Sequence, residues 1–315
     1  MSNFFKLIYN ELIKTYIRKS TWAMYIILAL LIIGLGFLTN TYEKTADNYD
    51  QDNWREVLHE ENEVYVKEEE EYFDGMNSHL IEENNYYLEH DIQPTGFGTW
   101  QFVLENQLLL SLVSLLTIII AAGIVANEFR WGTIKLLLIR PISRTKILLS
   151  KYISVLVFAL FTLLFVLFFS LIIGAIFFGL DGLNPSIVIE KSTGLAYVPV
   201  IGEIVSGYGY KLVNLVMMAT FAFMISTIFR NSALAIGTAI FLMMAGNQIV
   251  VFFAERSWAK YILFANTDLS QYTHGNAPWI DGMTLGFSIL MLIIYYAFFL
   301  LLSWIFFTKR DVAGN

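Results

Sequence analysis

Residues 127–151 read NEFRWGTIKLLLIRPISRTKILLSK and lie between two long apolar runs, 108–126 and 152–180. Neither run contains a charged side chain. Both reach the length that crosses a bilayer as a helix, about 17–25 residues. A polar segment held between two such runs must lie at a membrane surface. It carries six basic residues: Arg130, Lys135, Arg140, Arg144, Lys146 and Lys151.

The composition of the whole chain favours the same class of protein. Of its 315 residues, 57% are hydrophobic and 15% are charged. A soluble domain has about 25% charged residues. The chain has no Cys, which excludes disulfide bonds, thiolate metal ligands and cysteine catalysis.

Six apolar runs predict an all-α polytopic membrane protein. A helix satisfies every backbone polar group within lipid, and the runs lack the alternation of a β-barrel. The first run follows basic residues, as in a signal peptide, but no small-residue cleavage site comes after it, so we expect an uncleaved span. The predicted transmembrane helices are 21–39, 107–126, 152–180, 208–229, 233–253 and 284–307.

The distribution of Lys and Arg predicts the orientation. With the N-terminus inside, thirteen of the 20 basic residues fall in inside segments, which are also the shorter ones. The positive-inside rule then places both termini, including the tail 308–315, in the cytoplasm. Residues 181–207 and 254–283 become extracellular loops.

The two segments on either side of the first span have distinct compositions. Residues 1–20 combine an apolar stripe with Lys6, Lys14, Arg18 and Lys19, which predicts an amphipathic helix that lies in the interface and turns as an elbow into the first span. Residues 40–106 are acidic, with apolar residues at helical spacing over 53–89. We expect them to form a helical extracellular cap.

Motifs for catalysis are not found in the sequence. It contains no G-x-x-x-x-G-K-[ST], H-E-x-x-H or G-x-S-x-G pattern, and no metal site is expected. The chain by itself is therefore not expected to be an enzyme. Polar residues in or beside the spans are costly and informative. They either bond between helices or line a substrate path: Glu105, Asn214, Asn247 and Gln248.

The basic loop itself predicts a short surface helix. An apolar strip follows Gly132 and Thr133, and Pro141 cannot continue a helix begun there. Ser143 is placed to cap the helix that leads into the third span. By itself this pattern is also compatible with a loop that only contacts lipid headgroups.

The pattern Glu128-x-x-x-Gly132-Thr133-Ile134-x-x-Leu137-Leu138-x-x-Pro141-Ile142-Ser143-Arg144-x-x-Ile147-x-x-x-Lys151 resembles the cytoplasmic motif of ABC-2 type permeases, the membrane subunits of bacterial ABC exporters. The six-span layout with both ends inside is similar too. The resemblance implies that a helix at about 132–139 couples to a separate ATPase subunit. The residues it assigns to coupling are Glu128, Gly132, Thr133, Leu137, Arg140, Pro141, Ser143, Arg144 and Lys151.

The resemblance further implies ATP-driven efflux of a drug, peptide antibiotic, lipid or ion, with a link to antibiotic resistance. ATP and Mg²⁺ would be bound by the ATPase partner, with no cofactor in this chain. A second permease copy, identical or related, would complete the transporter, and no nucleic acid is expected as a partner. An alternative is a membrane sensor or immunity protein that binds a peptide antibiotic through the cap without transport.

Overall fold

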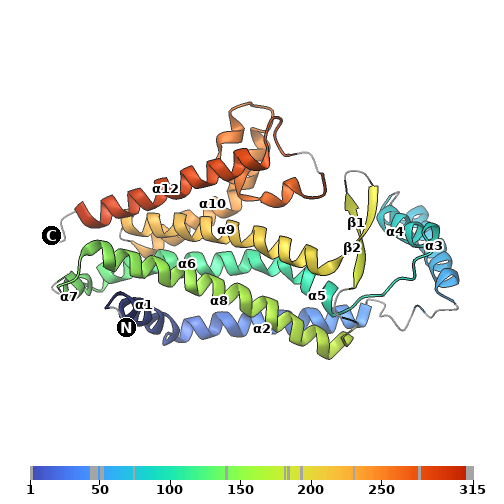
Figure 1. Ribbon diagram of the computed structural model, residues 1–315, viewed down its shortest axis with the longest axis horizontal. Coiled ribbons are helices and arrows are strands. Elements are labelled where there is room, and N and C mark those ends of the chain that lie inside the picture. The colour runs from blue at the N-terminus through green and yellow to red at the C-terminus, as the bar shows by residue number, and fades with distance from the viewer. Residues whose placement is uncertain are drawn as a thin grey trace. The chain divides into compact units, whose positions relative to one another are not determined.

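The computed structural model describes residues 3–42, 49, 53–73, 75–138, 141–180, 182, 185–191, 194–229, 231–275 and 278–309. Within these residues the chain is mostly α-helical (Figure 1). Six of the described helical segments are long and apolar enough to cross a membrane, which confirms an all-α polytopic membrane protein. They are α2 (Lys19–Tyr42), α5 to α6 (Thr99–Arg130), α8 (Arg144–Phe178), α9 (Val200–Phe229), α10 (Ser232–Phe252) and α12 (Leu285–Lys309).

Two of these segments begin within residues that the sequence analysis placed in extracellular segments. The second starts at α5 (Thr99–Glu105) and passes through a 3₁₀ turn (Asn106–Leu109) into α6 (Leu110–Arg130), whereas the apolar run starts at 107. Helix α9 starts at Val200 instead of 208. Its 30 residues extend over about 45 Å, longer than the ~30 Å of a hydrocarbon core. The first turns of these helices include polar residues, Thr99 and Gln101 in α5 and Glu203 in α9, so they fall outside the long apolar runs.

The segment predicted as an extracellular loop at 181–207 contains a β-hairpin. Strand β1 (Ser186–Lys191) pairs antiparallel with β2 (Gly194–Pro199), with Ser186 opposite Pro199 and Lys191 opposite Gly194. The sequence Ile187-Val188-Ile189 has the β-branched side chains that favour a strand. The sequence analysis did not predict these strands, because a six-residue strand is short beside the neighbouring apolar runs.

The chain divides into two compact units. Unit 1 comprises Met1–Ala29, Gln107–Val166 and Gly207–Asn315, and unit 2 comprises Leu30–Asn106 and Leu167–Ser206. Helices α2, α8 and α9 each contribute to both. Unit 1 holds the described part of the basic loop.

Small side chains bring the helices of unit 1 close together. Ala121 and Ala122 of α6, Ala219 and Ala222 of α9, and Ala235 of α10 are fully buried in one apolar cluster. Within lipid, small residues let helix backbones approach and gain van der Waals contact. The remaining elements of this unit are α1 (Asn3–Tyr16), α7 (Ile134–Leu138), α11 (Leu263–Thr267) and the 3₁₀ turns Ala259–Tyr261 and Leu269–Gly275.

Unit 2 contains a helical hairpin. Helix α3 (Trp54–Glu71) and helix α4 (Ser78–Glu89) pack against each other, and Trp54, Leu58 and Tyr87 form their buried core. The apolar residues at three- and four-residue intervals thus mark the inner face, and the helices predicted over 53–89 are confirmed.

Candidate functional site

The basic loop has a defined local structure on both sides of α7. Helix α6 ends at Arg130, and Gly132 follows with φ +70°, the left-handed conformation that favours glycine after a helix. At the other side, the Ser143 hydroxyl accepts a hydrogen bond from the Lys146 backbone N–H at 3.4 Å, so the predicted cap of α8 is confirmed. The surface helix predicted at 132–139 starts two residues later, and its described part is Ile134–Leu138. Arg140 lies outside the described residues.

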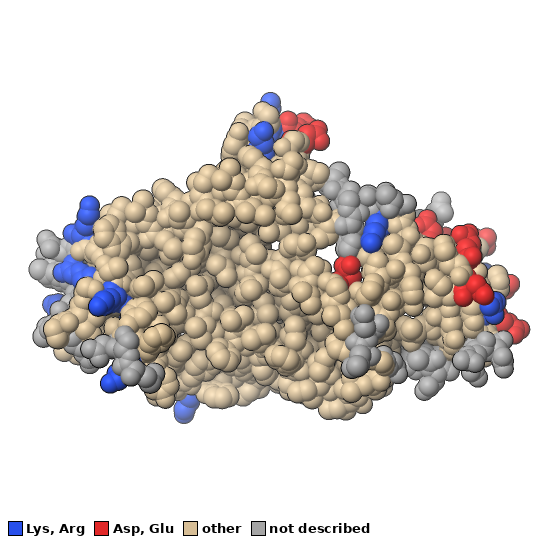
Figure 2. Space-filling model, in the orientation of Figure 1, with Lys and Arg blue, Asp and Glu red and all other residues tan. Residues whose placement is uncertain are grey.

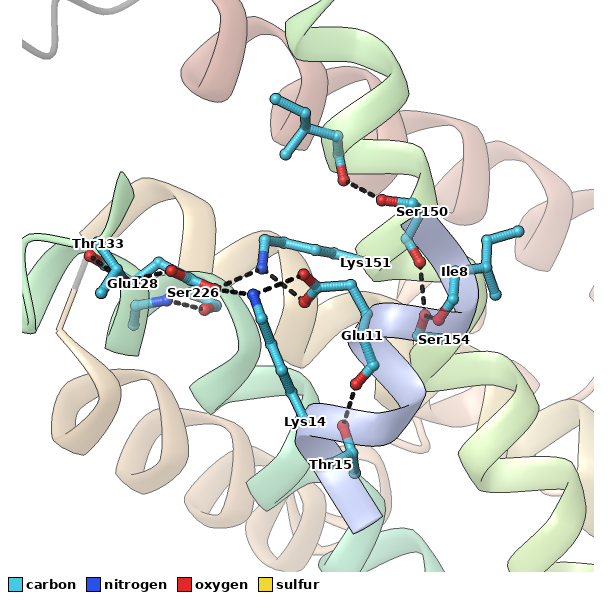
Figure 3. A network of polar contacts seen from close by, with 12 residues as sticks. Ile8, Glu11, Lys14, Thr15, Glu128, Thr133, Ser150, Lys151, Ser154 and Ser226 are labelled. Carbon is cyan, nitrogen blue, oxygen red and sulfur yellow. Dashed lines mark hydrogen bonds and ion pairs between the residues drawn. The ribbon is translucent and has the colours of Figure 1, made fainter. Parts of the chain in front are cut away.

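Four charged side chains from three helices meet beside this loop (Figure 3). We call Glu11 and Lys14 of α1, Glu128 of α6 and Lys151 of α8 the charge cluster. The Lys151 ammonium lies 2.7 Å from a Glu11 carboxylate oxygen and 3.0 Å from one of Glu128. The Lys14 ammonium lies 2.9 Å from Glu11 and 3.0 Å from Glu128. Each cation therefore bridges both carboxylates.

Burial makes this pairing necessary. The Lys151 side chain is 0% exposed, and those of Glu11 and Glu128 are 8% and 9% exposed, whereas Lys14 is 45% exposed. A buried ion is stable only when opposite charges and hydrogen bonds replace its water. Two cations and two anions balance each other here. Partial burial alone would lower the pKa of Lys14, but the carboxylates of Glu11 and Glu128 outweigh it, and the pKa is raised.

Further hydrogen bonds hold α1 against this site. The Ser154 hydroxyl of α8 donates to the Ile8 carbonyl at 3.2 Å, and the Thr21 hydroxyl of α2 donates to the Thr15 carbonyl at 2.6 Å. The Thr133 hydroxyl, directly before α7, donates to a carboxylate oxygen of Glu128 on α6. Helix α1 is thus attached to α8 along its length, and Glu128 is tied to the start of α7.

Sequence reasoning missed Glu11 and did not give Lys14 a structural partner. A usable signal was present. Glu11 is the only acidic residue among residues 1–42, and Glu128 is the only one among 106–180. A lone acid in an apolar and basic environment predicts an ion pair, although the sequence does not say with which cation.

The nine residues assigned to coupling do not all face the same way. Glu128 and Lys151 point into the charge cluster, and the Arg144 guanidinium donates to the Thr308 carbonyl of α12 at 3.0 Å. Gly132 and Pro141 are exposed. Thr133 and Leu137 are half-buried. Ser143 is exposed, and its hydroxyl caps α8.

The outward surface of the loop combines apolar and basic side chains. Leu136 of α7 is 67% exposed, and Lys135 beside it is exposed as well. Trp131 is also exposed, and the Arg18 guanidinium lies 5.4 Å from the centre of its ring. Aromatic and Arg side chains of this kind are enriched at protein interfaces.

The polar residues predicted in or beside the spans do not form one described site. Asn214 is half-buried in α9, and Asn247 and Gln248 are exposed on α10, all in unit 1, whereas Glu105 is exposed in unit 2. A different polar set links the helices of unit 1. The Tyr152 hydroxyl of α8 lies 2.7 Å from the Thr220 hydroxyl of α9 and 3.1 Å from that of Tyr296 of α12.

The described residues hold no group of three His, Asp or Glu side chains that fits a metal ion.

Six apolar helical segments in the described residues, two of them joined by the short basic loop, define a multi-pass α-helical membrane protein. Residues 72–313 match the family described as "Protein of unknown function (DUF2705)", and the chain belongs to this family. It is 45% identical over 315 residues to "Uncharacterized protein YhcI" of Bacillus subtilis (strain 168), covering 98% of this chain and 99% of that protein. It is 37% identical over 203 residues to "Uncharacterized membrane protein YdbK" of the same organism, covering 64% of this chain and 78% of that protein.

Proposed function

We propose that this protein is the permease subunit of an ATP-driven ABC exporter in a bacterial cell membrane. The resemblance of residues 128–151 to ABC-2 type permeases motivates the proposal. One observation carries it: the same motif joins α7, whose Lys135 and Leu136 are exposed, to buried residues that connect three other helices. A coupling helix that transmits a conformational change from an ATPase to the spanning helices needs both an exposed contact surface and a rigid attachment to those helices.

The contacts suggest how the force is transmitted. An ATPase subunit bound to Leu136 and Lys135 would move α7 when it closes on ATP. Glu128 would pass the movement to α1 and α8 through Lys151, and Arg144 would pass it to the end of α12. Rigid-body rotation of packed helices is a common form of such transitions.

The orientation in this proposal follows from the positive-inside rule, and its partners follow from the resemblance to ABC-2 type permeases. Both termini and α7 lie in the cytoplasm, α1 lies as an elbow helix in the interface, and α3 with α4 forms an extracellular cap. The ATPase partner binds ATP and Mg²⁺, and a second permease copy completes the pathway for the exported molecule.

Co-purification tests this proposal. We expect the affinity-tagged chain, extracted from its native membrane, to bring down a protein with a Walker ATP-binding motif, identified by mass spectrometry. Leu136→Glu should abolish this association, because it places an anion in the proposed contact. Lys309→Glu changes an exposed charge at the end of α12 on the same proposed side and should retain the ATPase. Absence of a Walker-motif protein from the wild-type sample would refute the permease assignment.

A further inference from the structure

The turn of the α3–α4 hairpin exposes an unusual group of apolar side chains. Phe73 is 74% exposed, and Tyr72, Met76 and Leu80 are exposed as well. We call these four residues the hairpin tip. Large apolar side chains that gather at a water-exposed position mark interaction sites on soluble surfaces. Aromatic residues and Met are enriched in such sites, and Met adapts to partners of different shape.

The hairpin tip is held in place by polar contacts behind it. The buried Asn77 side chain donates to the Glu68 carboxylate at 2.9 Å and to the Tyr65 carbonyl at 3.3 Å. Its backbone N–H donates to the Glu69 carboxylate at 2.7 Å. Gly75, with φ +80°, allows the chain to reverse. These bonds fix a turn that directs its apolar residues outward, so a ligand would meet a surface that is already ordered.

The charge around the hairpin tip favours a cationic binding partner over an anionic one. Helix α3 contains eight Glu residues against Arg55 and Lys67. Glu68 and Glu69 bond to Asn77, whereas Glu70 and Glu71 are exposed next to Tyr72. Figure 2 shows acidic side chains over α3 and α4. A second copy of the hairpin and an anionic membrane surface would both meet like charge, which disfavours contact.

We propose that the hairpin tip binds a cationic amphipathic peptide. The apolar face of the peptide would cover Tyr72, Phe73, Met76 and Leu80, and its Lys or Arg side chains would lie over Glu70 and Glu71. Amphipathic helices bind other proteins through their apolar face, and complementary charges beside that face add specificity. The inference rests on the proposed function in two respects: that the cap is extracellular and that the protein exports a molecule. If both hold, the inference narrows the exported molecules to cationic peptides.

Binding can be measured on the full-length protein in zwitterionic nanodiscs without an ATPase. The probe is a fluorescent synthetic helix of Leu and Lys with one apolar face, and its anisotropy is compared with that in empty discs. We expect saturable binding to the protein-containing discs that weakens as salt rises, because the charges are exposed. A matched peptide with Glu in place of Lys should not bind.

Two variants and one control locate the site. Phe73→Ser with Met76→Ser removes apolar contact, and Glu70→Gln with Glu71→Gln removes charge. Each pair should weaken binding at least tenfold with an unchanged circular dichroism spectrum, since all four residues are exposed. Glu89→Gln removes an exposed charge at the other end of α4 and should bind as the wild type does. The proposal would be overturned if both double variants bound the peptide as tightly as the wild type. It would also be overturned if empty discs gave the same anisotropy change as discs that contain the protein.

The two proposals fail separately. Loss of peptide binding in the tip variants with retained ATPase co-purification leaves both standing. Peptide binding by a chain that brings down no ATPase supports the hairpin tip as a binding surface and refutes the permease.

Discussion

Replacing Lys151 by Met removes the cation at the centre of the charge cluster while keeping a long apolar side chain. Lys151 is 0% exposed and contacts both Glu11 and Glu128, so the change leaves two buried carboxylates with Lys14 as their remaining cation in the cluster. The cluster passes from neutral to one net negative charge. The Lys151 side chain is 0% exposed, so its position has no contact with bulk solvent that could compensate for the lost charge.

The expected cost follows from this burial. Breaking a buried ion pair by removing one partner typically costs about 3–5 kcal/mol of the free energy of unfolding. Lys14→Met removes a cation with similar distances to the same carboxylates, but its side chain is 45% exposed. Solvent screening reduces its expected cost to about 0.2–1 kcal/mol. Glu11→Gln added to Lys151→Met restores neutrality and should recover about 0.5–3 kcal/mol, the usual coupling of residues in contact.

The free energy of unfolding can be measured by SDS titration in mixed micelles, followed by far-UV circular dichroism. Lys135→Met on the exposed surface of α7 serves as the control and should change stability by less than about 0.5 kcal/mol. If Lys151→Met costs no more than Lys14→Met, burial does not decide the strength of this cluster and the reasoning is refuted. If adding Glu11→Gln to Lys151→Met lowers the stability further, charge balance is not what makes the cluster stabilising.

Three further outcomes are expected. Leu136→Glu should leave the free energy of unfolding within about 0.5 kcal/mol of the wild type, because the side chain is exposed, while ATPase co-purification is lost; a destabilised variant that keeps its ATPase would contradict the role of α7. Gly246→Ala should cost about 1–3 kcal/mol in the same titration, since its methyl group would overlap the Phe264 ring. Gly237→Ala on the same helix meets nothing within 4 Å and should be neutral or slightly stabilising; equal costs would refute the contact. The pKa of Lys14 is raised above 10.5, so its contribution to the free energy of unfolding is complete below that pH and is lost as pH rises through the folded-state pKa. The wild-type protein should therefore lose stability above pH 10.5 more steeply than Lys14→Met does. Parallel curves of stability against pH for the two proteins would argue against the ion pairs.

Much of the fold followed from local patterns. Six apolar runs indicated six spanning helices because a bilayer leaves the backbone no other partner than its own helix. Ser143 caps α8, and the described part of α7 ends before Pro141, because capping and the missing proline N–H are local effects. The hairpin of β1 and β2 escaped prediction, since strand pairing depends on a partner segment more than on the strand's own residues.

By itself, the sequence determined that the chain spans a membrane, where its spans lie along the chain, and that residues 127–151 form a basic loop between two of them. Only the tertiary structure decided which way the loop's residues face. Glu128 pairs with Lys14 across 114 positions, and Lys151 pairs with Glu11 across 140. Which side of a helix is buried depends on its rotation against its neighbours, and this rotation is set by packing between distant segments. The motif that seemed to be one contact surface is therefore divided into residues that attach the loop to the bundle and residues that are exposed.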